Sequence, residues 1–262
     1  MTQAHNPTAT PPAPVALVTG AARRLGRAIA LALARDGWDV VVHYRDSRQE
    51  ADAAVAEIVA LGRRALALRC DLGDDGEVRQ LLARARAALG PVSCLVNSAS
   101  QFDYDDAADF SPALLHSHMQ ANLVAPLLLA QALHAATAEG AQSVVINLLD
   151  QKLYNLNPDY LSYTLSKAAL HTATTMLAQA LAPKVRVVGV APGLSLRSGE
   201  QSEAEFAHAH RLTPLGRSST AADVADSVCY AARAGALTGT TLLVDGGQHL
   251  VPTRRDVMFI AK

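Results

Sequence analysis

The chain of 262 residues has little of what marks nucleic-acid-binding or membrane-spanning proteins. Only 18% of its residues are charged, the formal net charge is -1, and lysine and arginine form nothing longer than doublets such as Arg23-Arg24. A nucleic-acid partner is not expected, because affinity for a phosphate backbone needs a clustered basic face. No run of about eighteen apolar residues occurs, so no membrane span is expected either.

Cysteine is also scarce, and the patterns that bind zinc are absent from the sequence. The three cysteines have no metal-ligand or redox spacing: Cys70, Cys94 and Cys229. The nine histidines show no zinc spacing, since a pair such as His116 and His118 points to different sides of a helix. We therefore expect unpaired thiols, a reducing cytoplasmic compartment and no metal.

The first fourteen residues, "MTQAHNPTATPPAP", lack the charged start and apolar core of a signal peptide. Their proline, threonine and alanine content predicts a flexible tail over residues 1–14. No composition break follows, so residues 15–262 are expected to form a single domain.

Apolar residues, in contrast, make up half of the chain, and strand-like and helix-like segments alternate along it. The expected strands are 15–20, 39–44, 65–72, 93–100, 143–150, 185–193 and 240–247. The expected helices are 24–37, 48–62, 74–90, 118–140, 160–183 and 220–235, the last with Thr220 as N-cap. This order predicts an α/β fold, a single doubly wound Rossmann domain with a seven-stranded parallel sheet flanked by helices. Residues 194–219 are expected to be an irregular connection that covers the substrate.

The stretch "TGAARRLG", residues 19–26, joins the first expected strand to the first expected helix. Gly20 permits a tight turn, and Gly26 lets helix and strand pack closely. The free N–H groups of the helix N-terminus attract a pyrophosphate. A dinucleotide site is therefore predicted, with Gly20, Arg23, Arg24 and Leu25 among its contacts. Arg24 stands where such a turn usually has a second glycine.

The second expected strand ends in "HYRDSR", at the point where a dinucleotide ribose is recognised. A 2′-phosphate wants cations and hydroxyls, and four residues supply them: His43, Tyr44, Arg45 and Ser47. Asp46 opposes a phosphate. We therefore expect NADPH/NADP+ rather than NADH as the cofactor.

Asp71 and Leu72 follow the third expected strand and are predicted to lie beside the adenine. The Asp71 carboxylate either accepts a hydrogen bond from the adenine amino group or caps the helix that follows. The sequence leaves both roles open.

Tyr163 and Lys167, in "YTLSK", lie four residues apart and so share one face of a helix. An ammonium about 4 Å from a phenol would lower its pKa by roughly three units. A phenol with such a pKa serves as a general acid near neutral pH. The spacing alone also fits a packed tyrosine beside a solvated lysine.

Taken together, these motifs resemble the short-chain dehydrogenase/reductase family over roughly residues 15–250. Beside the first turn and the Tyr163-Lys167 pair they include "NSA" at 97–99, Asn122, "PG" at 192–193 and "VDGG" from Val244. The resemblance implies that Tyr163 donates a proton and that Lys167 holds the nicotinamide ribose and lowers the tyrosine pKa. It implies that Asn122 anchors a water-linked proton relay and that the chain forms a homotetramer. It also implies further cofactor contacts at Asn97, Ser98, Ala99, Tyr163, Pro192 and Gly193.

Asp150 departs from the family pattern, because this position, thirteen before the tyrosine, is normally a serine that binds a substrate carbonyl. A carboxylate would repel a carbonyl oxygen. Asp150 fits a substrate that presents N–H groups to the carboxylate. It also fits a protonated carboxyl that delivers a proton to a ring nitrogen, as the reduction of a C=N bond requires.

The segments "TGAARRLG", "NSASQF" and "INLLD" are similar to the pteridine reductase branch of this family. That resemblance implies that the substrate is a pterin, held by Arg24, Ser100, Phe102, Asp150, Tyr163 and Leu194. Ser98 and Asp46 do not match the branch. The expected function is NADPH-dependent reduction of a small-molecule pterin or folate-like substrate. Two alternatives stay open, a carbonyl reductase of ketoacyl or sugar type and a dinucleotide sensor without turnover.

Overall fold

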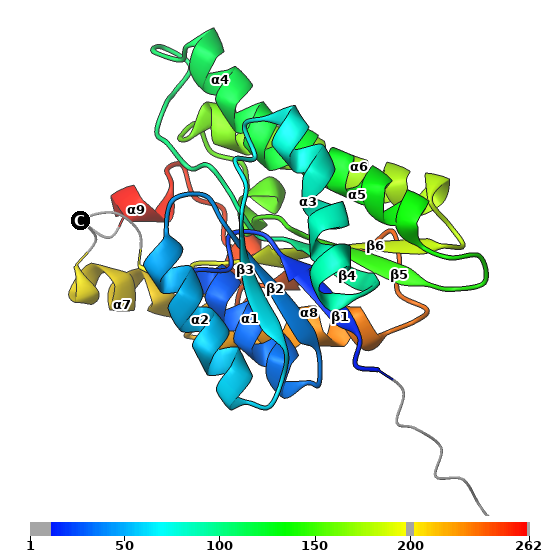
Figure 1. Cartoon of the computed structure of the whole chain (residues 1–262). Coiled ribbons are helices and arrows are strands. Elements are labelled where there is room, and N and C mark those ends of the chain that lie inside the picture. Colours follow the sequence, from blue (N-terminus) through cyan, green and yellow to red (C-terminus); the bar gives the residue numbers. More distant parts are fainter. Residues whose placement is uncertain (1–11, 198–201, 261–262) are drawn as a thin grey trace, which may run out of the picture.

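A single sheet of seven parallel strands forms the centre of the molecule in the computed structural model, which describes residues 12–197 and 202–260 (Figure 1). The strands are β1 (Val15–Val18), β2 (Asp39–Tyr44), β3 (Ala65–Arg69), β4 (Val92–Asn97), β5 (Ser143–Leu148), β6 (Val185–Pro192) and β7 (Thr241–Val244). Their order across the sheet is β3-β2-β1-β4-β5-β6-β7. The predicted Rossmann architecture is confirmed. Residues 1–11 of the predicted tail lie outside the described residues.

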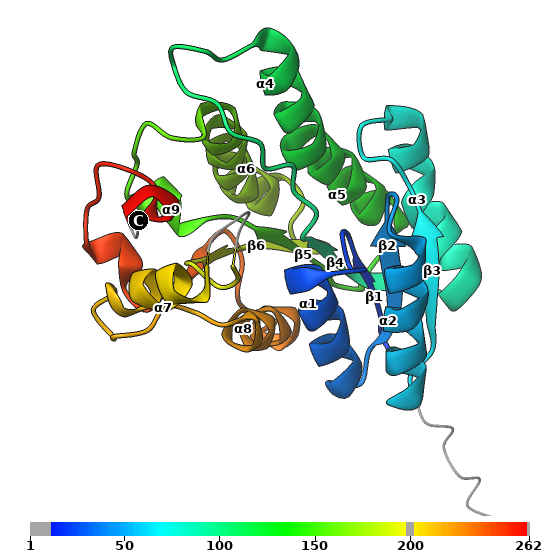
Figure 2. The ribbon, with the colours of Figure 1, turned by 90° about the vertical axis from the view of Figure 1, so that its left-hand side faces the viewer.

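Helices cover both faces of the sheet (Figure 2). On one face α1 (Arg24–Arg35), α2 (Arg48–Ala60) and α8 (Ala221–Arg233) bury side chains such as Ile29, Ile58 and Val228. On the other face lie α3 (Asp75–Leu89), α5 (Ala125–Ala136) and α6 (Leu161–Ala180), with Leu81 and Leu129 in the core. Because both faces are covered, β1, β2 and β5 are buried along their whole length, which explains their continuous apolar runs.

The chain order reverses between β1 and β4, since β2 and β3 lie on one side of β1 and β4 to β7 on the other. In sheets of this kind ligands bind beyond the carboxyl ends of the strands at such a switch point. The ends of β1, β2 and β4 are therefore where a nucleotide is expected.

The helix predicted over 118–140 is wrong in its bounds and its regularity. Helical structure begins at α4 (Pro112–Met119), passes through a π-turn, η1 (Gln120–Val124), and continues as α5. Ser111 caps α4 by accepting from the Leu114 N–H, and proline at the first helical position favours that start.

The irregular connection predicted over 194–219 contains a helix, α7 (Glu203–Arg211). Its start is stabilised by a capping box in which Ser202 and Glu205 bond each other's backbone N–H groups. The predicted N-cap Thr220 is confirmed, because its side chain accepts from the Asp223 N–H. Three short elements complete the chain: η2 (Gln151–Tyr154), η3 (Gln248–Leu250) and α9 (Val257–Ile260). Among the described helices, none has the length and hydropathy of a bilayer-crossing segment.

Candidate active site

The turn between β1 and α1 is packed too tightly for side chains at its two glycines. Gly20 has a φ of +63°, and a Cβ there would lie 2.9 Å from the Ala99 Cα. A Cβ at Gly26 would lie 2.2 Å from the Gly20 carbonyl oxygen. Thr19 ties this turn to β4, since its Oγ1 accepts from the N–H groups of Ser98 and Ala99 at 3.0 Å each.

Gly26→Ala is therefore expected to destabilise the fold by about 1–3 kcal/mol, because the added methyl group must displace backbone of the turn. Thermal unfolding with and without NADPH measures this. Gly235→Ala is the matched control, since the nearest atom to a Cβ there, the Gln142 Oε1, is 3.8 Å away. Equal melting temperatures for the two variants would contradict the close packing.

Arg24 has a φ of +52°, a left-handed conformation that explains why a glycine is usual at this position. The strain of such a conformation persists only where the surroundings hold it. Here the Arg24 Nη2 donates to the Arg197 carbonyl oxygen at 2.7 Å. The first turn is thereby joined to the segment that follows β6.

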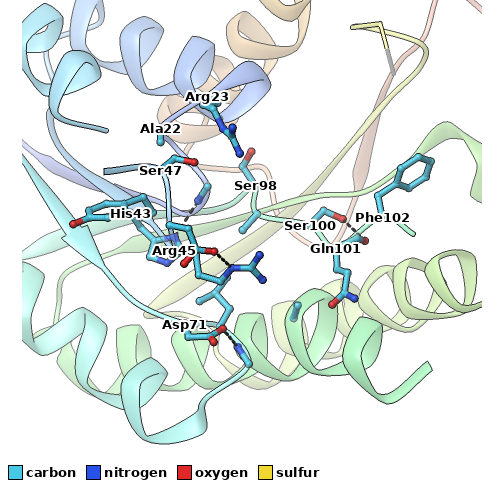
Figure 3. A pocket seen from close by; sticks show the side chains of 18 of the residues that line it. Ala22, Arg23, His43, Arg45, Ser47, Asp71, Ser98, Ser100, Gln101 and Phe102 are labelled. Carbon is cyan, nitrogen blue, oxygen red and sulfur yellow. Dashed lines mark hydrogen bonds and ion pairs between the residues drawn. The ribbon is translucent and has the colours of Figure 1, made fainter. Parts of the chain in front are cut away.

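A large open cavity of about 1120 Å³ lies at the switch point, at the carboxyl ends of β1, β2 and β4 (Figure 3). It brings together the following predicted residues: Gly20, Arg23, Arg24, Leu25, His43, Tyr44, Arg45, Ser47, Asp71, Leu72, Ser98, Ala99, Ser100 and Phe102. Other predicted residues do not form its walls: Asn97, Asn122, Asp150, Tyr163, Lys167, Pro192, Gly193 and Leu194. The cavity thus unites most of the predicted nucleotide contacts with three of the predicted substrate contacts, Arg24, Ser100 and Phe102.

His43 is not the cation that the sequence predicted at this end of the cavity. The imidazole is buried, its Nδ1 accepts from the Gly20 N–H at 3.0 Å, and its Nε2 lies 3.0 Å from the Cys70 carbonyl oxygen. Burial lowers the pKa of His43 to about 4, so the ring is neutral at pH 7. The neutral ring therefore stabilises the turn at Gly20 by accepting a hydrogen bond from its N–H.

Arg45 and Ser47 remain as polar groups at the end of β2 and lie on the cavity side in Figure 3. The Arg45 Nε donates to the Asp46 carboxylate at 2.7 Å, so Asp46 partly neutralises this cation. Ser47 precedes α2 without a side-chain capping bond. In the first turn, the Arg23 Nη1 lies 3.7 Å from the Glu50 Oε1.

The helix-cap role considered for Asp71 is wrong, because Asp74 caps α3 by accepting from the Glu77 N–H. Asp71 instead accepts from the Gly73 N–H at 2.8 Å, while the Glu77 carboxylate accepts from the Asp71 N–H. Glu77 thus fixes Asp71 at the cavity wall, a role that sequence reasoning missed.

Asp150, just after β5, and Tyr163, in the first turn of α6, form a hydrogen-bonded pair. The Tyr163 hydroxyl donates to the Asp150 Oδ2 at 2.8 Å, and the Lys152 N–H donates to the Asp150 Oδ1 at 2.8 Å. Burial raises the pKa of Asp150. Burial and the neighbouring Asp150 carboxylate raise the pKa of Tyr163 well above its ordinary value. Both groups are therefore biased towards holding their protons.

The prediction that Lys167 lowers the Tyr163 pKa is wrong in this structure. The Lys167 Nζ donates to the Leu148 carbonyl oxygen at 2.7 Å and lies 5.8 Å from the centre of the Tyr163 ring. The phenol faces a carboxylate more closely than it faces the cation. Burial lowers the pKa of Lys167 to about 8.

Asn122 lies in the π-turn η1, a helix distortion that is frequent at functional sites. Its Oδ1 accepts from the Gln101 N–H at 2.8 Å, and its Nδ2 donates to the Gln101 carbonyl and to the Ser166 Oγ at 3.0 Å each. The side chain joins the segment that carries Ser100 and Phe102 to the helix that carries Lys167.

The Asn97 side chain bonds within the sheet and does not line the cavity. Its Nδ2 donates to the Asn147 Oδ1 at 2.8 Å, and Asn147 donates on to the Thr174 Oγ1. Asn97 and Asn147 face each other in the β4–β5 register and form a buried amide pair, and the predicted cofactor contact at Asn97 stays a prediction. The sequence signal for this amide pair is an asparagine at or near the end of each of the two strands β4 and β5.

Pro192 ends β6, and Gly193 and Leu194 follow it beside Gln248, a residue that sequence reasoning also missed. The Gln248 Oε1 accepts from the Leu194 N–H at 3.0 Å and would lie 2.7 Å from a Cβ at Gly193.

Phe102 is 42% exposed and lies beside the Asp150–Tyr163 pair. Its ring stacks on the Tyr160 ring at 4.4 Å and meets the Tyr163 ring edge-on at 4.7 Å. Ser100, on the same segment, donates to the Gln101 carbonyl at 3.2 Å.

Comparison with known proteins places the chain among reductases. A family model described as enoyl-(acyl carrier protein) reductase matches residues 20–249. An uncharacterized oxidoreductase of Methylorubrum extorquens is 34% identical over 242 residues, covering 89% of this chain and 96% of its own. The 3-oxoacyl-[acyl-carrier-protein] reductase FabG of Staphylococcus aureus is 30% identical, covering 90% and 98%.

Among solved structures, FolM alternative dihydrofolate reductase 1 from Brucella canis, complexed with NADP, is similar with a TM-score of 0.88. It is 38% identical, and the match covers 93% of this chain and 96% of that one. Since the family model and these relatives span nearly all of the sheet, the first turn and the Tyr163-Lys167 pair, the chain belongs to the short-chain dehydrogenase/reductase family.

Proposed function

We propose that the chain is an NADPH-dependent reductase that reduces a C=N bond of a pterin or a related N-heterocycle. The observation that carries the proposal is the Asp150–Tyr163 hydrogen bond of 2.8 Å, at the position where a carbonyl reductase of this family has a serine. The NADP-bound dihydrofolate reductase of Brucella canis, 38% identical, supports the same substrate class.

The residues of the first turn fit a dinucleotide. Gly20 has no side chain and lines the cavity, and α1 has no acidic side chain in its first turn that would repel a phosphate. Arg45 and Ser47 would hold a 2′-phosphate, and Asp71 would accept from the adenine. NADPH, when bound, supplies the hydride.

Asp150 and Tyr163 would manage the proton. Because burial raises its pKa, Asp150 would be biased towards the protonated form and could pass this proton to a ring nitrogen when the adjacent carbon accepts a hydride. The carboxylate that remains accepts hydrogen bonds from the Tyr163 hydroxyl and the Lys152 N–H. Lys167 would hold the nicotinamide ribose, and Asn122 would keep the proton path open to water.

Phe102 would place the flat ring of the substrate, since one of its faces is covered by Tyr160 and the side chain is still 42% exposed. Arg24 and Ser100 line the same cavity and offer donors to acceptor atoms of a heterocycle. Leu194 would close the site from the end of β6.

Purified protein mixed with NADPH and a dihydropterin or dihydrofolate should lose the NADPH absorbance. No turnover with either compound, together with turnover of ketones, would contradict the proposal. A carbonyl reductase is the second candidate, because the 3-oxoacyl reductase of Staphylococcus aureus is 30% identical over almost the whole chain.

Arg45→Ala is expected to raise the KM for NADPH about tenfold and to leave the KM for NADH unchanged, because a charge-assisted hydrogen bond to the 2′-phosphate is lost. Steady-state kinetics with each cofactor measures this. Arg48→Ala is the matched control, since Arg48 pairs with Asp52 on α2. A parallel rise for both cofactors would place Arg45 outside the phosphate site.

A homotetramer is part of the proposal. Leu165 and Met176, on α6, are apolar and exposed, as a face covered by another subunit would be. Sedimentation equilibrium would test the stoichiometry, and a monomer would contradict it.

A further inference from the structure

The C-terminal segment, residues 251–260, is bound to the chain just ahead of α6 by a series of polar contacts. In Figure 2 its helix α9 lies beside α7, at the opposite end of the sheet from the edge strand β3. The Asn155 Nδ2 donates to the Val251 carbonyl oxygen at 2.8 Å. Arg255 pairs with the Asp159 carboxylate, which also accepts from the Asp256 N–H at 2.7 Å. The segment is thus fixed at the start of the helix that carries Tyr163.

A buried ion pair holds the same segment at a second point. The Lys152 Nζ lies 3.1 Å from the Asp256 Oδ2 and donates to the Asp159 carbonyl oxygen at 2.6 Å. The Lys152 and Asp256 side chains are 4% and 16% exposed, so water does little to compensate either charge. Lys152 is also the residue whose N–H binds Asp150, two residues earlier. The C-terminal segment therefore joins the active-site loop directly.

Aromatic rings continue this connection to the reacting groups. Phe259 stacks with Tyr160 at 6.2 Å and an interplanar angle of 26°, and Tyr160 stacks with Phe102 at 4.4 Å and 18°. Phe102 in turn meets Tyr163 edge-on. Tyr104 packs edge-on against both Tyr160 and Phe259, at 5.1 and 5.7 Å. The three nearly parallel rings follow one another from the C-terminus to the place proposed for the substrate.

Tyr160 has a strained backbone at the centre of this stack. Its φ of +57° and ψ of 55° put a bulky residue in the left-handed region at the N-cap of α6, where it forms no side-chain capping bond. Strain of this kind persists only where packing holds it, and it concentrates at functional sites. The conformation has one visible result, which is the insertion of the Tyr160 ring between Phe102 and Phe259.

We propose that the C-terminal segment is part of the substrate site, and that Phe259 and Tyr160 are positioning residues that fix the plane of Phe102 for a flat heterocycle. The inference rests on the proposed function, because a stacked ring is what a pterin needs. The proposal extends that function, because it gives residues 251–260 a role in substrate binding although none of them lines the cavity.

The test is Phe259→Leu, which removes the outermost ring and keeps an apolar side chain. We expect the KM for dihydropterin to rise about two- to tenfold, the range for the loss of one aromatic contact, with kcat and the KM for NADPH unchanged. Tyr160→Phe keeps the ring and should retain the wild-type KM, whereas Tyr160→Leu should raise it at least as much as Phe259→Leu. Phe110→Leu, at an exposed phenylalanine ahead of α4, is the matched control.

Melting temperatures of all four variants separate folding from positioning. If neither Phe259→Leu nor Tyr160→Leu changes the KM for dihydropterin, the inference alone is overturned. Equal rises in the KM values for dihydropterin and for NADPH also overturn the inference alone. A protein that reduces only ketones, with KM values indifferent to both variants, overturns the inference together with the proposed function. A selective rise for dihydropterin that Tyr160→Phe avoids supports both.

Discussion

Asp150→Ser should lower kcat/KM for dihydropterin by about 100- to 10,000-fold at neutral pH, the range for losing a general acid. A serine has no proton of suitable acidity for a ring nitrogen. The same substitution should raise kcat/KM for a ketone, because the hydroxyl donates to a carbonyl oxygen that a carboxylate repels. Steady-state kinetics with both substrates measures the reversal. Asp226→Ser, on the exposed side of α8, is the control.

The pH dependence of the same two proteins gives an independent measurement. Burial raises the pKa of Asp150, and the proton-donating form is lost as the pH rises through that pKa. Dihydropterin reduction should therefore fall on the alkaline side in the wild type, and Asp150→Ser should remove this limb. A second fall should also be present, near pH 8 in the wild type, because burial lowers the pKa of Lys167 to about 8 and its charge is lost above that pH. In Asp150→Ser this fall should move to lower pH, because Asp150 raises the pKa of Lys167. Identical profiles would exclude Asp150 as the proton donor.

Tyr163→Phe should lower kcat by about 100- to 10,000-fold for pterins and ketones alike. The phenol holds its proton firmly because burial and Asp150 raise its pKa, so it acts as a hydrogen-bond donor at every working pH. Its removal also leaves the Asp150 Oδ2 without its 2.8 Å partner. NADPH binding, followed by the fluorescence of the reduced nicotinamide, should change far less than kcat.

Tyr154→Phe is the control for that variant, because the Tyr154 hydroxyl lies 3.2 Å from His171 on the exposed side of the same region. The double variant Asp150→Ser/Tyr163→Phe should lose little more than the worse single variant, because the two groups act as a unit. An unchanged biological function of Tyr163→Phe in the cell would instead favour a dinucleotide sensor without turnover.

Features encoded by neighbouring residues could be predicted from the sequence. The close approach at Gly26, the cap at Thr220 and the alternation of strands and helices each depend on a few consecutive positions. The substitution of Asp150 for serine was also visible, because its spacing from Tyr163 is fixed along the chain.

Features that depend on distant segments could not be predicted in this way. His43 is neutral because segments from other strand ends bury it, and these carry its hydrogen-bond partners Gly20 and Cys70. The high pKa of Tyr163 follows from its burial and from its distance to Asp150, which only the fold determines. The stack of Phe102, Tyr160 and Phe259 joins three separate parts of the chain, and no local pattern marks it.

The π-turn at residues 120–124 determines what a single-residue deletion would do to the helix formed by α4, η1 and α5. Such a turn is equivalent to one residue inserted into an α-helix, and each residue advances the helix by about 100°. Deleting Ala121 should therefore convert α4, η1 and α5 into one regular helix in which both flanking helices keep their core-facing sides. The wide turn that sets the position of Asn122 would be lost. The amide of Asn122 would then point away from Gln101 and Ser166, and a single-residue deletion would disconnect the segment carrying Phe102 from the helix carrying Lys167.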